Sequence, residues 1–228
     1  MNSWLSLLLA SDAPALPQTW AMRMALTLGW SLVLALLGAG LGWRLSLPRR
    51  RLLALCLAGW TLLPGTLTPD YWLGLAFHAP SLSAMLLCVW MLWRTLFPSG
   101  MRLAWPHAGG TNRGYPSMGS IALLLVAVLM GYALLLDTFA VLAVQLYSWG
   151  FSPLLLLGLL AGSLLPWILG GAGPQQKGPA LWVAPMALLL FAATRLPTGN
   201  VWDALLDPWL WLLLHGQLLR QCYRRLRG

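Results

Sequence analysis

Residues 20–51 read WAMRMALTLGWSLVLALLGAGLGWRLSLPRRR, and this stretch decides the fold class. The apolar run from Trp20 to Trp43 contains a single charge, Arg23. A helix needs about 20 mostly apolar residues to cross the hydrocarbon core of a bilayer. The run is therefore predicted to span a membrane. Four arginines follow it: Arg44, Arg49, Arg50 and Arg51.

Apolar runs separated by short polar gaps continue along the whole chain of 228 residues, of which 59% are hydrophobic and 8% are charged. The sequence therefore predicts an all-α integral membrane protein with one polytopic domain over residues 1–228. The predicted spans, about seven, cover residues 20–43, 52–67, 71–97, 118–136, 153–169, 180–196 and 208–222. Six or eight spans are the alternatives, because Arg220 interrupts the last run early.

Smaller features carry expectations of their own. Residues 1–10 are predicted to form an interfacial leader that stays in the mature protein, and residues 137–151 an interfacial or partly re-entrant helix. Residues 197–207 contain a short amphipathic stretch. Thr68 is expected to cap the helix that follows it, and Pro80 to kink the third span.

The charged residues are distributed asymmetrically between the two sides of this topology. With the amino terminus outside, the inner gaps and the carboxyl-terminal tail hold 12 of the 14 basic residues. The outer side holds the remaining two, Arg23 and Arg195. It also holds all five acidic residues, Asp12, Asp70, Asp137, Asp203 and Asp207. Basic residues favour the cytoplasmic side, so the amino terminus is predicted outside and the carboxyl terminus inside.

The net charge of +9 points to lipid rather than to nucleic acid, because the basic residues flank apolar spans. Arginine outnumbers lysine 13 to 1, a composition typical of GC-rich bacterial genomes. The predicted location is the bacterial cytoplasmic (inner) membrane. A basic anchor is expected on anionic lipid headgroups: Arg49, Arg50, Arg51, Arg220, Arg224, Arg225 and Arg227.

Tryptophan and glycine mark expected helix boundaries and contacts. Most of the 15 tryptophans lie near span ends and are predicted to sit at the headgroup level, whereas Trp30 and Trp60 are expected between helices. Two pairs of glycines four residues apart allow close helix approach, with packing inside the chain as the default. They are Gly38 with Gly42, and Gly158 with Gly162.

The search for catalytic motifs finds none. The chain has no glutamate, no paired-cysteine metal spacing and no phosphate-binding glycine loop. His78 and His215 lie at similar predicted depths below the outer boundary of two spans. Two such imidazoles are what axial ligation of a haem b needs. The alternative is that each histidine bonds to a neighbouring helix, and no bound cofactor is the favoured prediction.

The outer side is the second candidate site. Its members are Arg23, Asp70, Asp137, Arg195, Asp203 and Asp207. Asp137 follows three leucines, so partial burial favours pairing with an arginine. The cluster is either a structural set of ion pairs or a polar vestibule that binds a substrate or a partner.

Three functional classes follow from this composition. The scarcity of reactive groups favours a non-catalytic accessory or assembly subunit of a larger membrane complex. A small transporter or permease, possibly as an oligomer of this chain, is the alternative, since Pro80, Pro166 and Pro185 provide places to break helices. A redox protein linked to haem b or quinone is the third class, and it depends on the two histidines.

Overall fold

The computed structural model describes residues 16–97, 118–169 and 180–227, with the side chains of 118–123, 166–169, 180–181 and 224–227 left out of the description. Within these ranges the chain is all-helical and contains no strand. The leader expected at residues 1–10 lies outside the described residues, as do Asp12, Arg102, Arg113 and Lys177.

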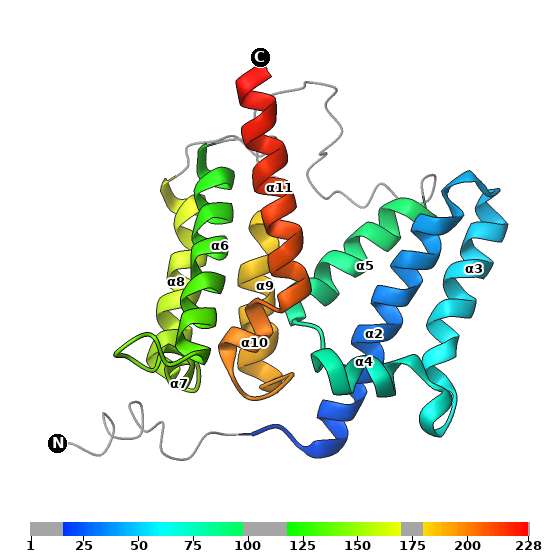
Figure 1. Ribbon diagram of the computed structural model, residues 1–228, viewed down its shortest axis with the longest axis horizontal. Coiled ribbons are helices and arrows are strands. Elements are labelled where there is room, and N and C mark those ends of the chain that lie inside the picture. The colour runs from blue at the N-terminus through cyan, green and yellow to red at the C-terminus, as the bar shows by residue number, and fades with distance from the viewer. Residues whose placement is uncertain (1–15, 98–117, 170–179, 228) are drawn as a thin grey trace.

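Seven helices of 13 to 23 residues form the body of the described chain. They are α2 (Thr19–Leu41), α3 (Leu47–Gly59), α5 (Leu82–Leu96), α6 (Met118–Thr138), α8 (Pro153–Leu169), α9 (Ala180–Thr194) and α11 (Pro208–Arg227). Figure 1 shows that successive members of this set run in alternating directions. Each of the seven helices overlaps one of the seven apolar runs in the sequence.

The short helices gather at one end of this bundle. They are α4 (Pro69–Phe77), α7 (Leu146–Trp149) and α10 (Val201–Leu205). Figure 1 places all three at the end where α2 begins, which we call the amino end, whereas α11 finishes at the opposite, carboxyl end. Three 3₁₀ turns complete the described helical elements: η1 (Gly42–Arg44), η2 (Trp60–Leu62) and η3 (Gly65–Leu67).

The helix expected over residues 71–97 is interrupted rather than kinked. α4 ends at Phe77, His78 adopts a left-handed φ of 59°, and α5 begins at Leu82. Pro80 lacks an amide hydrogen and disfavours helical geometry at the residue before it. The hydroxyl of Ser81 then accepts a hydrogen bond from Ala84 N at 3.1 Å and starts α5 as its N-cap.

The second predicted span also has different limits. α3 begins at Leu47, with a proline in its first turn, and so contains the arginines that were expected in a loop. It ends at Gly59, and residues 60–67 form two 3₁₀ turns instead of continuing the helix. In contrast, α8 and α9 continue through Pro166 and Pro185, so these prolines do not break their helices.

α5 connects the two parts of the bundle. It packs against α2 on one side and against α9 and α10 on the other. The larger core cluster lies on the second side and is formed by Leu82, Leu156, Ala187, Leu188, Phe191, Val201, Trp202 and Ala204. A smaller cluster of alanines, Ala35, Ala39 and Ala54, joins α2 to α3.

The two glycine pairs have different surroundings. A Cβ atom at Gly38 would lie 3.1 Å from the Cα of Ala54, so this glycine allows α2 and α3 to approach closely. Gly42 lies against the side chain of Arg50. A Cβ atom at Gly158 or Gly162 would meet nothing within 4 Å. Packing inside the chain therefore explains the first pair and does not explain the second.

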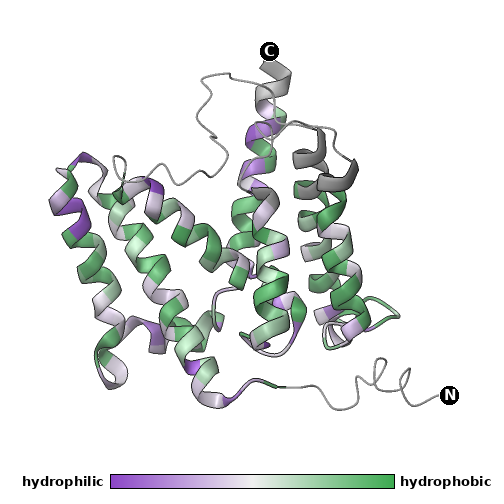
Figure 2. Ribbon diagram, turned by 180° about the vertical axis from the view of Figure 1, so that it is seen from behind, coloured by the Kyte–Doolittle hydropathy of each residue, from purple (hydrophilic) through white to green (hydrophobic). Residues whose placement is uncertain are grey.

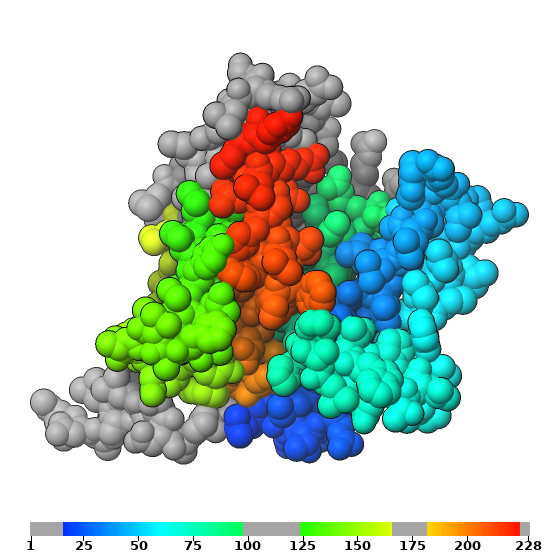
Figure 3. All heavy atoms as spheres, in the orientation of Figure 1, coloured from blue at the N-terminus to red at the C-terminus, as the bar shows by residue number. Residues whose placement is uncertain are grey.

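Hydrophobic residues predominate along the long helices (Figure 2), and Figure 3 shows the atoms of α11 on the near face between those of α6 and α4. Many large apolar side chains are exposed on the outside of the bundle. Leu41, Leu62 and Leu213, for example, are 76%, 77% and 68% exposed. Trp30 is buried between helices as predicted, whereas Trp60 is 48% exposed and bonds to Leu67 O through its indole nitrogen. By length and composition, one described helix, Thr19–Arg44, is capable of crossing a membrane. Four shorter apolar helices accompany it: Leu82–Leu96, Leu124–Thr138, Pro153–Leu165 and Trp182–Thr194.

Candidate functional site

A pocket of about 390 Å³ opens at the amino end and brings together polar groups that are far apart in the sequence. Its lining comes from the end of α4 and the break that follows (residues 76–79), and from the approach to α11 (residues 206–208). Tyr147, Thr198 and Asp203 complete it. We call it the α4–α11 pocket. It contains His78, Asp203 and Asp207 of the candidate residues that the sequence indicates.

Asp207 is held by two helix amino termini. One carboxylate oxygen accepts a hydrogen bond from Leu210 N at 2.7 Å, and so caps α11. The other accepts from Ser81 N at 2.8 Å, just before α5. The first amide groups of a helix lack intrahelical acceptors and carry a partial positive charge, so both bonds favour a carboxylate. Asp207 is only 8% exposed, and these contacts compensate its burial.

Asp203 is bound by two hydroxyl groups. Its Oδ2 accepts hydrogen bonds from Tyr147 Oη at 2.8 Å and from Thr198 Oγ1 at 2.5 Å. Burial, followed by the negative charge of Asp203, raises the pKa of the Tyr147 hydroxyl well above its ordinary value. Tyr147 therefore stays protonated at neutral pH and remains a hydrogen-bond donor.

The main chain of Tyr147 is fixed as firmly as its side chain. Its N–H donates to Asp137 Oδ2 at 2.7 Å, and its carbonyl accepts from Asn200 Nδ2 at 2.9 Å. Asn200 is completely buried and lies so close to Gly150 that a Cβ atom there would sit 1.9 Å from the amide oxygen. Asn200 also caps α10 through Trp202 N. Sequence reasoning missed Tyr147 and Asn200, although an asparagine just before a helix is a recognisable capping signal.

Asp70 belongs to a separate polar cluster between α2 and the start of α4. Thr27 Oγ1 donates to Asp70 Oδ2 at 2.7 Å, and the hydroxyl of Thr68 donates to the other oxygen. Thr68 was expected to cap α4, but its side-chain oxygen accepts no hydrogen bond from a backbone N–H of that helix. A cap needs the hydroxyl oxygen as an acceptor, whereas here the Thr68 hydroxyl acts as a donor to the Asp70 carboxylate.

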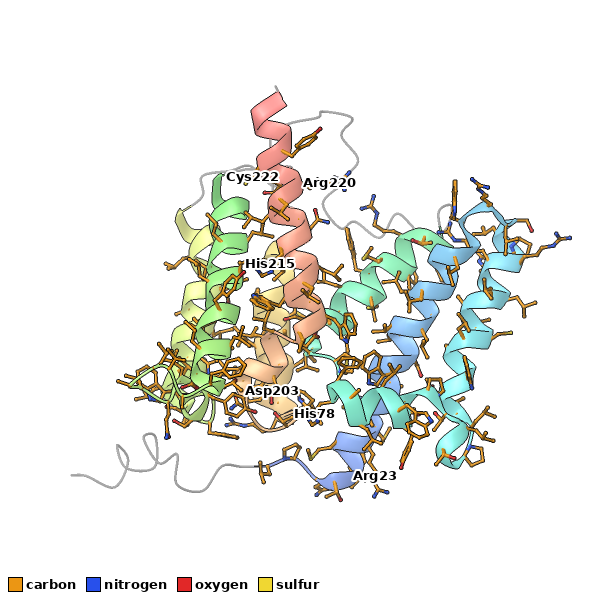
Figure 4. The ribbon with its side chains drawn as sticks, viewed as in Figure 1. Arg23, His78, Asp203, His215, Arg220 and Cys222 are labelled. Atoms are coloured by element: carbon orange, nitrogen blue, oxygen red, sulfur yellow. The ribbon has the colours of Figure 1, made fainter. Side chains whose placement is uncertain are left out.

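The two amino-end arginines do not pair with the aspartates in the described part of the chain. The Arg195 guanidinium lies over the ring of Phe191, 5.4 Å from its centroid. The backbone of Arg195 has a φ of 58° as the chain leaves α9. Asp137, which was expected to pair with an arginine, instead accepts the bond from Tyr147 N. Figure 4 places Arg23 near the start of α2, away from Asp203.

At the carboxyl end, part of the expected basic anchor bonds to protein. Arg50 Nε donates to Ala39 O at 2.5 Å, and Arg51 donates to Leu96 O through Nε at 2.9 Å and Nη2 at 2.6 Å. These carbonyls end α2 and α5, where acceptors have no intrahelical donor. Arg49 and Arg220 are exposed, whereas the side chains of Arg224, Arg225 and Arg227 lie outside the described residues.

The two histidines do not form a joint site. His215 lies on α11, where Nδ1 bonds to Trp211 O at 2.8 Å and Nε2 bonds to Tyr132 Oη at 3.1 Å. Both ring nitrogens are therefore occupied by protein groups. His78 lies at the break after α4, and Figure 4 shows it much nearer the amino end than His215. The matched depth that suggested two haem ligands is not found, because the third predicted span is broken at His78.

The α4–α11 pocket thus presents two carboxylates, a phenol and an imidazole, without an arginine or lysine in its lining. Among the described residues, no group of three histidine, cysteine or acidic side chains is arranged to hold a metal ion. The pocket is suited to binding a positively charged group or a hydrogen-bond donor. No family model, curated protein or solved structure matches this chain.

Proposed function

We propose that the chain is a multi-pass protein of the bacterial cytoplasmic membrane, with the seven long helices as its spans. The separation of charge supports this. Asp70, Asp137, Asp203 and Asp207 all belong to the amino end. Apart from Arg23 and Arg195, the basic residues with described side chains belong to the carboxyl end: Arg44, Arg49, Arg50, Arg51, Arg94 and Arg220. Under the positive-inside rule the carboxyl end is cytoplasmic.

Cysteine labelling tests this orientation. Cys222 is exposed near the end of α11, so it serves as a native reporter once Cys56 and Cys88 are replaced by alanine. A cysteine placed at the exposed Thr66 in a cysteine-free chain reports the opposite end. A membrane-impermeant maleimide should label Thr66→Cys in intact cells and Cys222 only after permeabilisation. The reverse pattern contradicts the orientation, and release of the protein without detergent contradicts membrane insertion.

We infer that this membrane protein is a non-catalytic accessory or assembly subunit of a larger complex. The observation that carries the inference is how its described polar groups are used. Asp70, Asp137 and Asp207 accept hydrogen bonds that fix helix ends and loops, and both nitrogens of His215 are engaged. Groups committed in this way are poorly placed for acid–base work. The open glycine face of α8 supports contact with another helix.

Purification from native membranes in a mild detergent tests the subunit proposal. A tagged chain should co-purify with one or more other membrane proteins at fixed stoichiometry, and the complex should survive gel filtration. Replacing Gly158 and Gly162 by leucine should release the partner and leave the chain folded. Recovery of the chain alone, at full yield and with native stability, counts against this function.

A transporter is the second candidate, and the break between α4 and α5 is the observation that favours it. Broken helices with free termini are used at substrate sites in transporters. Here the break lies beside the α4–α11 pocket. A transporter should be stable alone and gain thermal stability with its substrate. Reconstituted vesicles that accumulate a solute only when the chain is present would favour this candidate over the subunit.

A further inference from the structure

The charge of the α4–α11 pocket is not balanced by protein cations. Asp207 is compensated by the amino termini of α5 and α11. Asp203 receives only two neutral hydroxyl groups, and no arginine or lysine lines the pocket among the described residues. Both hydroxyls bind the same oxygen, Oδ2. A carboxylate offers about four acceptor positions on its two oxygens, so Asp203 retains acceptor capacity.

Aromatic rings form part of the same lining. Phe77 and Tyr147 both line the pocket. The Phe77 ring is held in place by Trp209, at 4.9 Å between centroids, and by Trp30, at 6.5 Å. Ring faces attract cations because of their quadrupole. A carboxylate with spare acceptors beside a fixed aromatic ring is a combination that suits an organic cation better than a metal ion.

From this geometry we infer that the α4–α11 pocket binds the ammonium group of a small organic cation. Asp203 is its counter-ion, and Phe77 and Tyr147 are its aromatic neighbours. A volume of about 390 Å³ fits a ligand of few atoms. Primary ammonium is the expected form, because its N–H groups use the acceptors that a quaternary ammonium leaves empty. The inference is independent of whether the chain is a subunit or a transporter.

The ammonium group has two possible sources, a soluble amine or the headgroup of phosphatidylethanolamine. Both present the same primary ammonium to Asp203. Isothermal titration of the purified full chain in detergent with n-butylamine tests the soluble source. Thermal unfolding in nanodiscs of phosphatidylethanolamine, compared with nanodiscs of phosphatidylcholine, tests the lipid source. Two comparison probes each lack one feature of the ammonium group: tetramethylammonium lacks the N–H donors, and butyrate lacks the positive charge.

The variants separate a pocket effect from a general loss of stability. Asp203→Asn removes the counter-ion. Asp70→Asn is its matched control, since Asp70 lies at the same end, bonds to Thr27 and Thr68 and is outside the pocket. Ala76→Leu narrows the pocket without changing its charge or adding an aromatic ring. This variant keeps the proposal testable if Asp203→Asn does not fold.

Saturable binding of butylamine, or stabilisation specific to phosphatidylethanolamine, is the expected result. The signal should weaken about tenfold or more in Asp203→Asn. It should also weaken in Ala76→Leu and stay unchanged in Asp70→Asn. Absence of both signals in the unmodified chain overturns the inference. Equal signals in the unmodified chain and in folded Asp203→Asn or Ala76→Leu also overturn it.

Discussion

The Asp207 carboxylate joins Ser81 N to Leu210 N, at 2.8 and 2.7 Å, and so ties the start of α5 to the start of α11. We expect Asp207→Ala to lower the free energy of unfolding by about 1–3 kcal/mol, because it leaves buried amide groups without acceptors. Asp207→Asn should lose less, since its amide oxygen still accepts one bond. Unfolding in mixed micelles measures both changes. A loss in Asp207→Ala no larger than that in Asp207→Asn would contradict the double cap.

Gly131 and Gly162 offer a matched pair of substitutions on two helices. A Cβ atom at Gly131 would lie 2.2 Å from Trp211 Nε1, whereas Gly162 has no neighbour within 4 Å. Gly131→Ala should therefore destabilise the purified chain by roughly 1–3 kcal/mol through overpacking. Gly162→Ala should be neutral or slightly stabilising in the isolated chain. Melting temperatures in detergent provide the comparison, and equal effects would argue against close packing of α6 on α11.

Tyr147 gives a pH-dependent prediction outside the proposed spans. Its pKa is raised in the folded chain, so the folded state holds the phenolic proton more tightly than the unfolded state does. The resulting stability is complete below the ordinary tyrosine pKa of about 10 and decreases as pH rises above it. The difference in melting temperature between the unmodified chain and Tyr147→Phe should be constant from pH 7 to 9. It should shrink above about pH 10. A difference that grows with pH would contradict a raised pKa for Tyr147.

Tyr132 and His215 should be energetically coupled. The 3.1 Å bond between Tyr132 Oη and His215 Nε2 joins α6 to α11. A double-mutant cycle with Tyr132→Phe and His215→Phe should give a coupling energy of about 0.6 kcal/mol, as for hydrogen bonds between membrane helices. Strictly additive losses would contradict this bond. The same preparations should show no haem absorbance, and a haem spectrum lost in His215→Phe would reinstate the redox class.

The sequence predicts where the long helices lie because each corresponds to an apolar run, although α3 has other limits and the third run is divided between α4 and α5. The segregation of aspartates and arginines to opposite ends also follows from it. The sequence does not predict that Arg50 and Arg51 bind carbonyls at the ends of α2 and α5. The two arginines lie on α3 and reach these carbonyls only when α2, α3 and α5 have packed together.

The candidate site was predicted less completely. The sequence places Asp203 and Asp207 together in the outer polar cluster, but it assigns His78 to a separate pair with His215. The left-handed turn at His78 is what brings the end of α4 to the start of α11. Tyr147 was missed because a tyrosine in an apolar loop looks like an interfacial residue. Its role depends on contacts with Asp137 and Asn200, which are 10 and 53 positions away in the chain.

The bond between Asp207 and Ser81 also orders events during synthesis. The two residues are 126 positions apart. At about 5–20 residues per second, roughly 6–25 s pass between the translation of one and of the other. Throughout that interval the amide of Ser81 has no carboxylate to accept its hydrogen. The amide of Ser81 therefore gains this acceptor only after Asp207 has been synthesised and the start of α11 has packed against α5. A nascent chain that stops before residue 207 differs from the full-length product in that its Ser81 amide lacks this hydrogen bond.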